Sequence, residues 1–248
     1  MKVDEIVPVL QARSASSRLP KKISREIVGV PLLHGLLQRI VGIEAAVPWI
    51  VTTRNPEDDW IAAAAQDFNL ECYRGEEKNV LSRFVHVVRE TGASTIIRLT
   101  GDNPLVHSSL VNEGLDVFRS LESSVQLVHD EPQLLPFGLM PDIVRSDSLL
   151  RAQQEIRLQD SYHRVHVTSW TKTYEPVAAF NIARPMLSRD WRWTIDTARD
   201  LEFHERLLRD FGSNWPQYSP EEIGLALLSR PEVANLNRDE QRKPLSAG

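Results

Sequence analysis

The feature that most constrains the fold is an alternation of two patterns in the first hundred residues. Short apolar runs of the kind that form buried strands occupy 6–10, 48–53 and 94–100. Longer segments with apolar residues at helical spacing cover 30–43, 55–68 and 78–92. Strands that alternate with helices in this way build right-handed βαβ units. The sequence therefore predicts an α/β domain with a Rossmann-like, mostly parallel sheet flanked by helices.

Local signals indicate the ends of two of these helices. Asn55 can cap the helix over 55–68, and Pro56 suits its first turn. Gly92 follows the helix over 78–92 and is a usual stop residue. Both helices therefore have boundaries that agree with their apolar spacing.

The second half of the chain is less regular. We expect strands over 125–129 and 174–182, a strand entering a helix over 141–156, a short strand and then a helix over 192–212, and a helix over 219–231. No linker or internal repeat interrupts these segments. We expect one continuous domain over 1–235 and a polar tail over 236–248.

Charge and composition exclude several classes of protein. The chain of 248 residues has a net charge of -5, which argues against a nucleic-acid or anionic membrane partner. It holds a single cysteine, Cys72, so no disulfide can form within it. No apolar stretch approaches the roughly 20 residues that cross a bilayer, and the N-terminus does not resemble a signal peptide. We expect a cytoplasmic protein.

A basic loop follows the first predicted strand of this acidic chain. It carries Arg13, Arg18, Lys21 and Lys22 and lacks the glycines of a Walker A loop. In parallel sheets, ligands bind beyond the carboxyl ends of the strands. Backbone N–H groups and basic side chains at such an end can surround a polyphosphate. A solvated surface loop is the alternative, but four basic side chains at this position favour a phosphate site.

The residues of this loop resemble a known family. The segment "QARSASSRLPKK" is similar to the A-R-x-x-S-x-R-L-P-x-K signature of the sugar-acid cytidylyltransferases, and most similar to their SpsF-like branch. Further segments resemble that branch in the same order: "GVPLL", "TTRNPEDD", "YRGEEKNVLSRF", "IIRLTGDNPLV", "HVT" and "RWTIDTARDLEF". The resemblance covers about residues 5 to 210. It implies the nucleotide-diphospho-sugar-transferase fold, Mg²⁺-dependent transfer of CMP from CTP to an acceptor with release of diphosphate, and a homodimer.

The resemblance also implies roles for single residues. The positions that hold the nucleotide and its phosphates are Ala12, Arg13, Ser16, Arg18, Lys22, Arg74, Thr100 and Gly101. Among them, Arg13, Arg18 and Lys22 carry the catalytic positive charge. Asp102 and Asp196 are the two metal ligands that the resemblance implies, and each follows a short apolar run. Mg²⁺ commonly takes one or two carboxylates, although an aspartate after a strand is also a frequent turn former.

The acceptor side departs from the family pattern. Asp142, His166 and Arg192 are the acceptor contacts that we expect, while His163 and His166 could alternatively form a metal pair. Phe137 and Met140 stand where the branch carries acidic residues, which predicts either a less polar acceptor pocket or a weakened one. In the loop, Lys21 stands where a glycine is usual.

Three functions fit these observations. The first is transfer of CMP to a sugar acid, sugar phosphate or phosphonate, in surface polysaccharide or modified-sugar biosynthesis. The second is a glycosyltransferase of the same fold, although "TGDNP" has only one acidic residue where such enzymes commonly carry D-x-D. The third is a non-catalytic nucleotide-binding homologue with a degenerate acceptor site.

Overall fold

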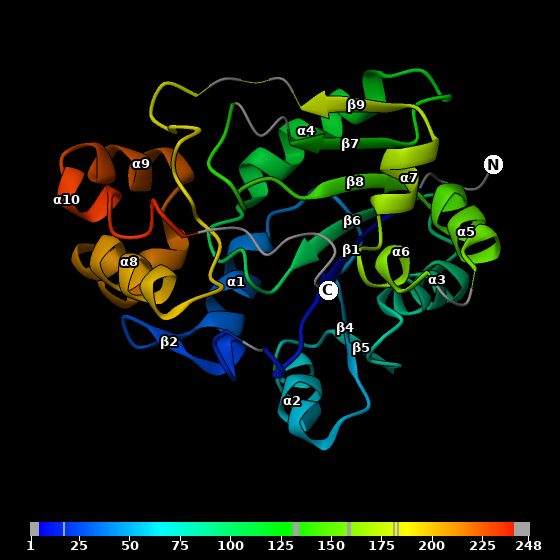
Figure 1. Cartoon of the computed structure of the whole chain (residues 1–248), viewed down its shortest axis with the longest axis horizontal. Coiled ribbons are helices and arrows are strands. Elements are labelled where there is room, and N and C mark those ends of the chain that lie inside the picture. The colour runs from blue at the N-terminus through cyan, green and yellow to red at the C-terminus, as the bar shows by residue number, and fades with distance from the viewer. Residues whose placement is uncertain are drawn as a thin grey trace.

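A seven-stranded sheet forms the centre of the molecule (Figure 1). The computed structural model describes residues 5–16, 18–130, 134–157, 160–180, 182 and 184–240. Within these residues the strand order is β5-β4-β1-β6-β8-β7-β9. The strands are β1 (Ile6–Gln11), β4 (Trp49–Thr53), β5 (Glu71–Gly75), β6 (Thr95–Thr100), β7 (Leu127–Asp130), β8 (Asp142–Arg145) and β9 (Val177–Phe180). A separate hairpin joins β2 (Glu26–Ile27) to β3 (Val30–Pro31).

The pairing of the strands confirms the predicted sheet. Strands β5, β4, β1 and β6 pair in parallel, and so do β7 and β9. Strand β8 pairs antiparallel with both β6 and β7. The carboxyl ends of β5, β4, β1 and β6 therefore lie along one edge of the sheet, which is where the basic loop and the "TGDNP" turn begin.

Helices cover both faces of the sheet. They are α1 (Leu32–Ile40), α2 (Asp59–Asp67), α3 (Val80–Thr91), α4 (Ser108–Ser120), α5 (Ser146–Glu155), α6 (Ser161–Val165), α7 (Ser169–Tyr174), α8 (Ala198–Leu208), α9 (Pro220–Leu228) and α10 (Pro231–Ala234). The 3₁₀ helices of the described residues are η1 (Lys22–Ser24), η2 (Pro56–Asp58) and η3 (Arg209–Gln217).

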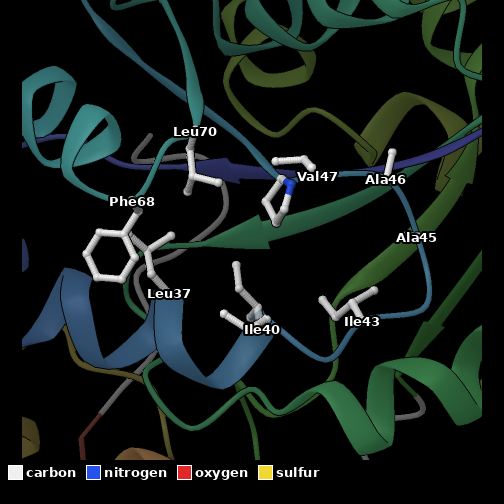
Figure 2. A pocket seen from close by; sticks show the side chains of 10 residues that line it. Leu37, Ile40, Ile43, Ala45, Ala46, Val47, Phe68 and Leu70 are labelled. Carbon is white, nitrogen blue, oxygen red and sulfur yellow. The ribbon is translucent and has the colours of Figure 1, made fainter.

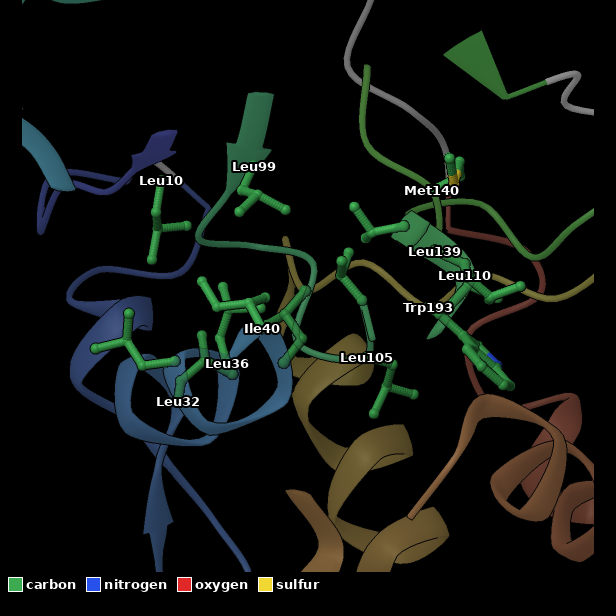
Figure 3. Close-up of a cluster of buried hydrophobic side chains, with 14 of the residues drawn as sticks. Leu10, Leu32, Leu36, Ile40, Leu99, Leu105, Leu110, Leu139, Met140 and Trp193 are labelled. Carbon is green, nitrogen blue, oxygen red and sulfur yellow. The ribbon is translucent and has the colours of Figure 1, made fainter. Parts of the chain in front are cut away.

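The alternation of side chains along each strand divides the core between the two faces. Leu10 and Leu99 point to one face and pack with α1, α4 and the C-terminal helices (Figure 3). Val9 and Ile96 point to the other face and pack with α3 and α5. Buried apolar side chains on both faces are what a parallel sheet requires, so the strands are held rigidly beneath the loops at their ends.

Most predicted boundaries agree with the structure. Gly92 ends α3 with a positive φ of 70°, and its N–H donates to the carbonyl of Val88. Ser219 begins α9 through a capping box with Glu222. The helix α4 was not among the predictions, since its N-cap is His107, a residue without a strong capping preference.

Two local predictions were wrong. The side chain of Asn55 does not cap the helix that follows it, because its Nδ2 donates to Glu77 Oε2 at 3.0 Å instead. The short strand expected near 192 is a single bridge between Phe137 and Arg192. That bridge joins the segment before β8 to the segment before α8, which brings two distant parts of the sequence to the edge of the site.

The start of the predicted tail packs against the domain. Leu236 contacts the core, and Asn237 is buried. Residues 241–248 of the predicted tail lie outside the described residues. Leu236 and Asn237 therefore pack with the domain, although the prediction placed them in the polar tail.

Candidate active site

The basic loop and the "TGDNP" turn lie against each other at the carboxyl ends of β1 and β6. The N–H of Gly101 donates to the carbonyl of Gln11 at 2.9 Å. A Cβ atom on Gly101 would lie 2.8 Å from Ile23 Cδ1, so glycine permits the close contact between turn and loop. The two nucleotide segments predicted from the sequence therefore form one surface.

Lys22 lies at the centre of this surface. Its ammonium Nζ lies 3.2 Å from Asp102 Oδ2 and 3.0 Å from Asp196 Oδ1, and it donates to the carbonyl of Ile195 at 2.9 Å. The structure thus brings together three predicted site residues that are far apart in the sequence. Two carboxylates and one ammonium form a single charged centre.

The opposite charges of this centre stabilise the ionised forms of Lys22 and Asp102. Burial lowers the pKa of Lys22, but Asp102 and Asp196 outweigh burial and hold that pKa above its ordinary value. Burial raises the pKa of Asp102, yet the charge of Lys22 and the hydrogen bonds from Lys22, Thr100 and the backbone together outweigh burial, so that pKa lies below its ordinary value. Lys22 is therefore protonated and Asp102 ionised at neutral pH.

Asp196 also forms ion pairs with two arginines. Arg18 Nη2 lies 2.9 Å from Asp196 Oδ2, and Arg192 Nη2 lies 2.8 Å from the same oxygen. The predicted catalytic residues Arg18 and Lys22 are therefore together. Arg192, expected among the acceptor contacts, belongs to this charged centre.

A buried carboxylate that sequence reasoning missed holds the Asp196 segment in place. Asp200 is fully buried and accepts from Arg192 Nε at 3.0 Å and from the N–H of Asp196 at 2.9 Å. It also closes a capping box with Thr197 at the start of α8. The T-x-x-D spacing of that box was the signal that could have found it.

Asn237 completes this support from the C-terminal segment. Its Nδ2 donates to Asp200 Oδ1 at 2.9 Å and to the carbonyl of Arg192 at 3.0 Å. No sequence signal marks Asn237, since it lies in a polar stretch whose contact with α8 depends on the tertiary fold. The network Arg192–Asp196–Asp200–Asn237 fixes one side of the charged centre.

Arg13 lies apart from Lys22, on the side of β4 and β5. Arg13 Nη1 lies 3.3 Å from Glu77 Oε1, and both side chains are partly exposed. Asp58, which is fully buried, accepts from the N–H of Ser14 at 2.6 Å and from the hydroxyl of Thr53. Asp58 therefore holds the start of the basic loop against β4.

The remaining loop residues are placed by backbone contacts. The N–H of Ala12 donates to the carbonyl of Val51 at 3.1 Å, and Ser16 Oγ accepts from the N–H of Leu19 at 3.4 Å. Lys21 is exposed and adopts a left-handed backbone conformation, with φ of 55°. A glycine would adopt that conformation without the Cβ penalty.

The side chain of Arg74 makes its contacts outside the charged centre. Its Nε and Nη2 donate to the carbonyls of Thr53 and Asn55, each at 2.9 Å, and its Nη1 lies 2.7 Å from Asp59 Oδ1. The structure thus uses the guanidinium of Arg74 to hold the connection between β4 and α2. Its predicted approach to the nucleotide remains a prediction.

Two of the predicted acceptor residues share the neighbourhood of Arg98. Asp142 accepts from Thr168 Oγ1 at 2.6 Å and lies 2.8 Å from Lys172 Nζ and 3.3 Å from Arg98 Nη1. Burial raises the pKa of Asp142, but Lys172 and Arg98 outweigh burial and bring that pKa to about 2. Burial, and then Arg98, lowers the pKa of His166.

The histidines give no support to a metal pair. His163 Nδ1 hydrogen-bonds to Ser169 Oγ at 2.8 Å, a contact between α6 and α7. Among the described residues, no group of three or more His, Cys, Asp or Glu side chains could hold a metal ion. His163 has a structural role, while Nε2 of His166 is buried without a hydrogen-bond partner in the described chain.

The expectation of a less polar acceptor pocket was wrong for Met140. Met140 is buried in the core beside Leu139 and Leu110 (Figure 3). A Cβ atom on Gly114 would overlap its Cε, so Met140 fills the space that Gly114 leaves. Phe137 instead lies under the charged centre, with its ring centroid 5.6 Å from Arg192 Cζ.

An apolar pocket of about 270 Å³ lies at the opposite end of the strands (Figure 2). It is lined by the end of α1, by Ile43 and residues 45–48 before β4, and by Phe68 and Leu70 before β5. These segments precede the strands, so the pocket is at their amino ends. No charged side chain is among the residues that line it, which distinguishes it from the basic loop at the carboxyl ends of the strands.

The largely parallel seven-stranded sheet, with the basic loop and the carboxylate pair at the carboxyl ends of its strands, is the architecture of nucleotidyltransferases. The same fold occurs in a cytidylyltransferase structure from Leptospira borgpetersenii, with a TM-score of 0.84, 21% identity and coverage of 97% of this chain and 99% of that one. It also occurs in a CMP:2-keto-3-deoxy-manno-octonic acid synthetase complexed with CTP, with a TM-score of 0.64, 19% identity and coverage of 84% and 99%.

The chain belongs to the cytidylyltransferase family, whose family model matches residues 7–179. It is a CTP-dependent nucleotidyltransferase. It is 29% identical to the spore coat polysaccharide biosynthesis protein SpsF of Bacillus subtilis, over 94% of this chain and 98% of that protein. It is 26% identical to a 3-deoxy-manno-octulosonate cytidylyltransferase of Geobacter sulfurreducens, over 50% of this chain and 53% of that protein. Within the described residues, no helix is both long and apolar enough to cross a membrane.

Proposed function

We propose that the centre formed by Lys22, Asp102 and Asp196 transfers CMP from CTP to a sugar-acid or related acceptor. The observation that supports this most is the convergence of both carboxylates on the Lys22 ammonium, at 3.2 and 3.0 Å. Through Lys22, the basic loop is paired with both aspartates near the carboxyl ends of the strands. These are the charges that a transfer of a phosphoryl-type group requires.

The reaction breaks the bond between the α-phosphorus of CTP and the oxygen of the departing diphosphate. An acceptor oxygen attacks the α-phosphorus in line with that bond and becomes bonded to the phosphorus of CMP. A hydroxyl acceptor gives its proton to water, whereas an ionised carboxylate, phosphate or phosphonate has none to lose. The protein contributes mainly by positioning and by stabilising charge. In this proposal Arg13, Arg18 and Lys22 neutralise the phosphates, and Ala12, Ser16, Thr100 and Gly101 hold the nucleotide.

The residues present fit a magnesium ion. Asp102 is ionised, and it and Asp196 already converge on one cation, the Lys22 ammonium. A hard divalent cation that takes one or two carboxylates, phosphate oxygens and water suits this pair. Asp102 and Asp196 would hold Mg²⁺, which when bound supplies positive charge to the phosphate and acceptor oxygens.

The neighbourhood of Asp142 supports an anionic acceptor. Arg98 and Lys172 carry two positive charges and Asp142 carries one negative charge, so the cluster keeps one net positive charge. His166 lies beside it with a lowered pKa, and therefore stays neutral at neutral pH. A sugar carboxylate, phosphate or phosphonate would complement this cluster.

The test is mass spectrometry of reactions that contain CTP, Mg²⁺ and panels of sugar acids, sugar phosphates and phosphonates. We expect a CMP conjugate together with diphosphate. Parallel reactions with nucleotide-sugars test the glycosyltransferase alternative, which predicts release of a nucleoside diphosphate. If CTP binds but no acceptor in the panel yields a conjugate, the non-catalytic alternative gains and this proposal is contradicted.

The family resemblance supports three further proposals. We propose a homodimer, a cytoplasmic location and a role in surface polysaccharide or modified-sugar biosynthesis. Light scattering after size-exclusion chromatography measures the mass in solution, for which the proposal predicts twice the chain mass of 28.2 kDa.

A further inference from the structure

A buried serine closes the basic loop. Ser14 is only 2% exposed, although Arg13 beside it is exposed. The carbonyl of Ser14 accepts a hydrogen bond from the N–H of Lys21 at 3.1 Å. This bond joins the start of the loop to its end, where Lys22 follows and pairs with the two aspartates. Ser14 therefore lies between two of the cations that the proposed reaction uses.

The segment after β4 fastens Ser14 through three further hydrogen bonds. The N–H of Ser14 donates to Asp58 Oδ1 at 2.6 Å, and its hydroxyl donates to the carbonyl of Glu57 at 2.8 Å. The same hydroxyl accepts from Trp60 Nε1 at 2.9 Å. The N–H, the carbonyl and the hydroxyl of Ser14 are thus all used, and its partners outside the loop belong to one short segment.

Asp58, the anionic partner of Ser14, is itself held in place. Its carboxylate is fully buried, and its second oxygen accepts from the hydroxyl of Thr53, the last residue of β4. Burying a carboxylate costs free energy, which its hydrogen bonds must offset. A loop that only crosses the surface has no need of such an anchor. The buried carboxylate therefore fixes Ser14 relative to the sheet itself.

The conformation of Lys21 agrees with this closure. Lys21 adopts a left-handed backbone conformation, with φ of 55°, which carries a penalty for a residue with a Cβ atom. The hydrogen bond from its N–H to Ser14 offsets part of that penalty. The loop thus turns towards the charged centre without the glycine that such a turn usually takes.

The structure assigns Ser14 and Asp58 as positioning residues that hold the basic loop in its phosphate-binding shape before CTP binds. This inference rests on the proposed function, since the phosphates are those of CTP. Neither side chain is available to bind a phosphate, because Asp58 is buried and anionic and the Ser14 hydroxyl is used by its neighbours. Their effect passes through Arg13 and Lys22, the cations on either side of the closure.

This role predicts a particular kinetic signature. A loop without its anchor spends less time in the binding shape, so the apparent affinity falls by the fraction of time that is lost. A bound triphosphate restores the shape, so KM for CTP should rise by more than kcat falls. CMP carries one phosphate and makes fewer contacts with the loop, so its affinity should change less than that of CTP.

The test is titration calorimetry of CTP and of CMP, with Mg²⁺, on the full chain and four variants. Asp58→Ala removes the acceptor of the Ser14 N–H. Asp58→Asn is the conservative variant, since its amide keeps an oxygen for Ser14 and a polar group for Thr53. Trp60→Phe removes the donor to the Ser14 hydroxyl and keeps an aromatic ring. Asp67→Ala is the control, because Asp67 is an exposed aspartate on the neighbouring helix α2.

We expect Asp58→Ala to weaken CTP binding by about 10- to 100-fold, the value of a hydrogen bond to a charged group, and CMP binding by less than about threefold. Trp60→Phe should weaken CTP binding by about 3- to 10-fold, the value of a neutral hydrogen bond. Asp58→Asn should stay within about threefold of the wild type, because the hydrogen bond to Ser14 is kept. Asp67→Ala should bind both nucleotides as the wild type does.

The melting temperature of each variant separates loss of positioning from loss of the fold. Folded Asp58→Ala and Trp60→Phe variants with wild-type CTP affinity would overturn the inference and leave the proposed function intact. Equal losses of CTP and CMP affinity would also overturn it, since the anchor would then serve the whole fold. If Asp58→Ala does not fold, the same comparison in Trp60→Phe decides. A wild type that binds neither nucleotide refutes the proposed function as well.

Discussion

Replacing Lys22 and, separately, its neighbour Lys21 tests the assignment of the basic loop. The Lys22 ammonium has three oxygen partners, within 2.9–3.2 Å, and its side chain is only 14% exposed. Lys21 is exposed. Lys22→Ala removes a cation from a partly buried phosphate site, where one such charge is worth about 3–4 kcal/mol of transition-state stabilisation. Turnover should therefore fall by about 10²–10³.

The assay is steady-state release of diphosphate from CTP with an acceptor that reacts. Lys21→Ala should lower turnover by less than about tenfold, since an exposed charge is screened by solvent. The melting temperature of each variant shows whether the protein remains folded. Equal losses in two folded variants would mean that Lys22 is not the lysine of the phosphate loop, and an intact Lys22→Ala variant would refute its catalytic role.

Three further changes follow from the structure. Lys21→Gly should raise the free energy of unfolding in urea by about 1 kcal/mol, because glycine adopts the left-handed conformation without the Cβ penalty; a decrease would contradict this. Asn237→Ala should lower the free energy of unfolding by about 1–3 kcal/mol, because Asp200 and the carbonyl of Arg192 each lose the hydrogen bond from Asn237. It should also reduce kcat, because Asp200 holds the segment that carries Asp196. An unchanged kcat would show that Asn237 stabilises the fold without affecting the site. The pKa of Asp142 is about 2, below its ordinary value of 3.8. The ionised carboxylate therefore contributes about 2 kcal/mol to the free energy of unfolding above pH 4, and this contribution is lost as the pH falls towards 2. The difference in melting temperature between wild type and Asp142→Asn should therefore shrink over that range, and a constant difference would contradict the pairing.

The sheet and the nucleotide side of the site could be predicted because their signals are local. Apolar runs, helical spacing and the four charges of the basic loop are visible in single segments of the sequence. The motifs then identified Lys22, Asp102 and Asp196, and the structure brings these three together. Ends of parallel strands meet at one edge, which predicts that the basic loop after β1 lies near Asp102 after β6. Asp196 follows no strand of the sheet, so its place in the site was predicted from the motif alone.

The supporting residues could not be predicted because they depend on tertiary contacts. Asn237 reaches Asp200 only because the C-terminal segment folds back to α8. Asn55 has a capping sequence, yet Glu77 competes successfully for its side chain. Met140 stands in an acceptor-like motif, but its side chain turns into the core against Gly114.

The most direct test of the central claim is turnover of Asp102→Asn, followed as diphosphate release from CTP with Mg²⁺ and a reactive acceptor. Asp116→Asn is the matched control, because Asp116 is an exposed aspartate on α4. The account predicts that Asp102→Asn remains folded and loses turnover by at least about 10²-fold, while Asp116→Asn behaves as the wild type. A folded Asp102→Asn variant with near wild-type diphosphate release would contradict the account.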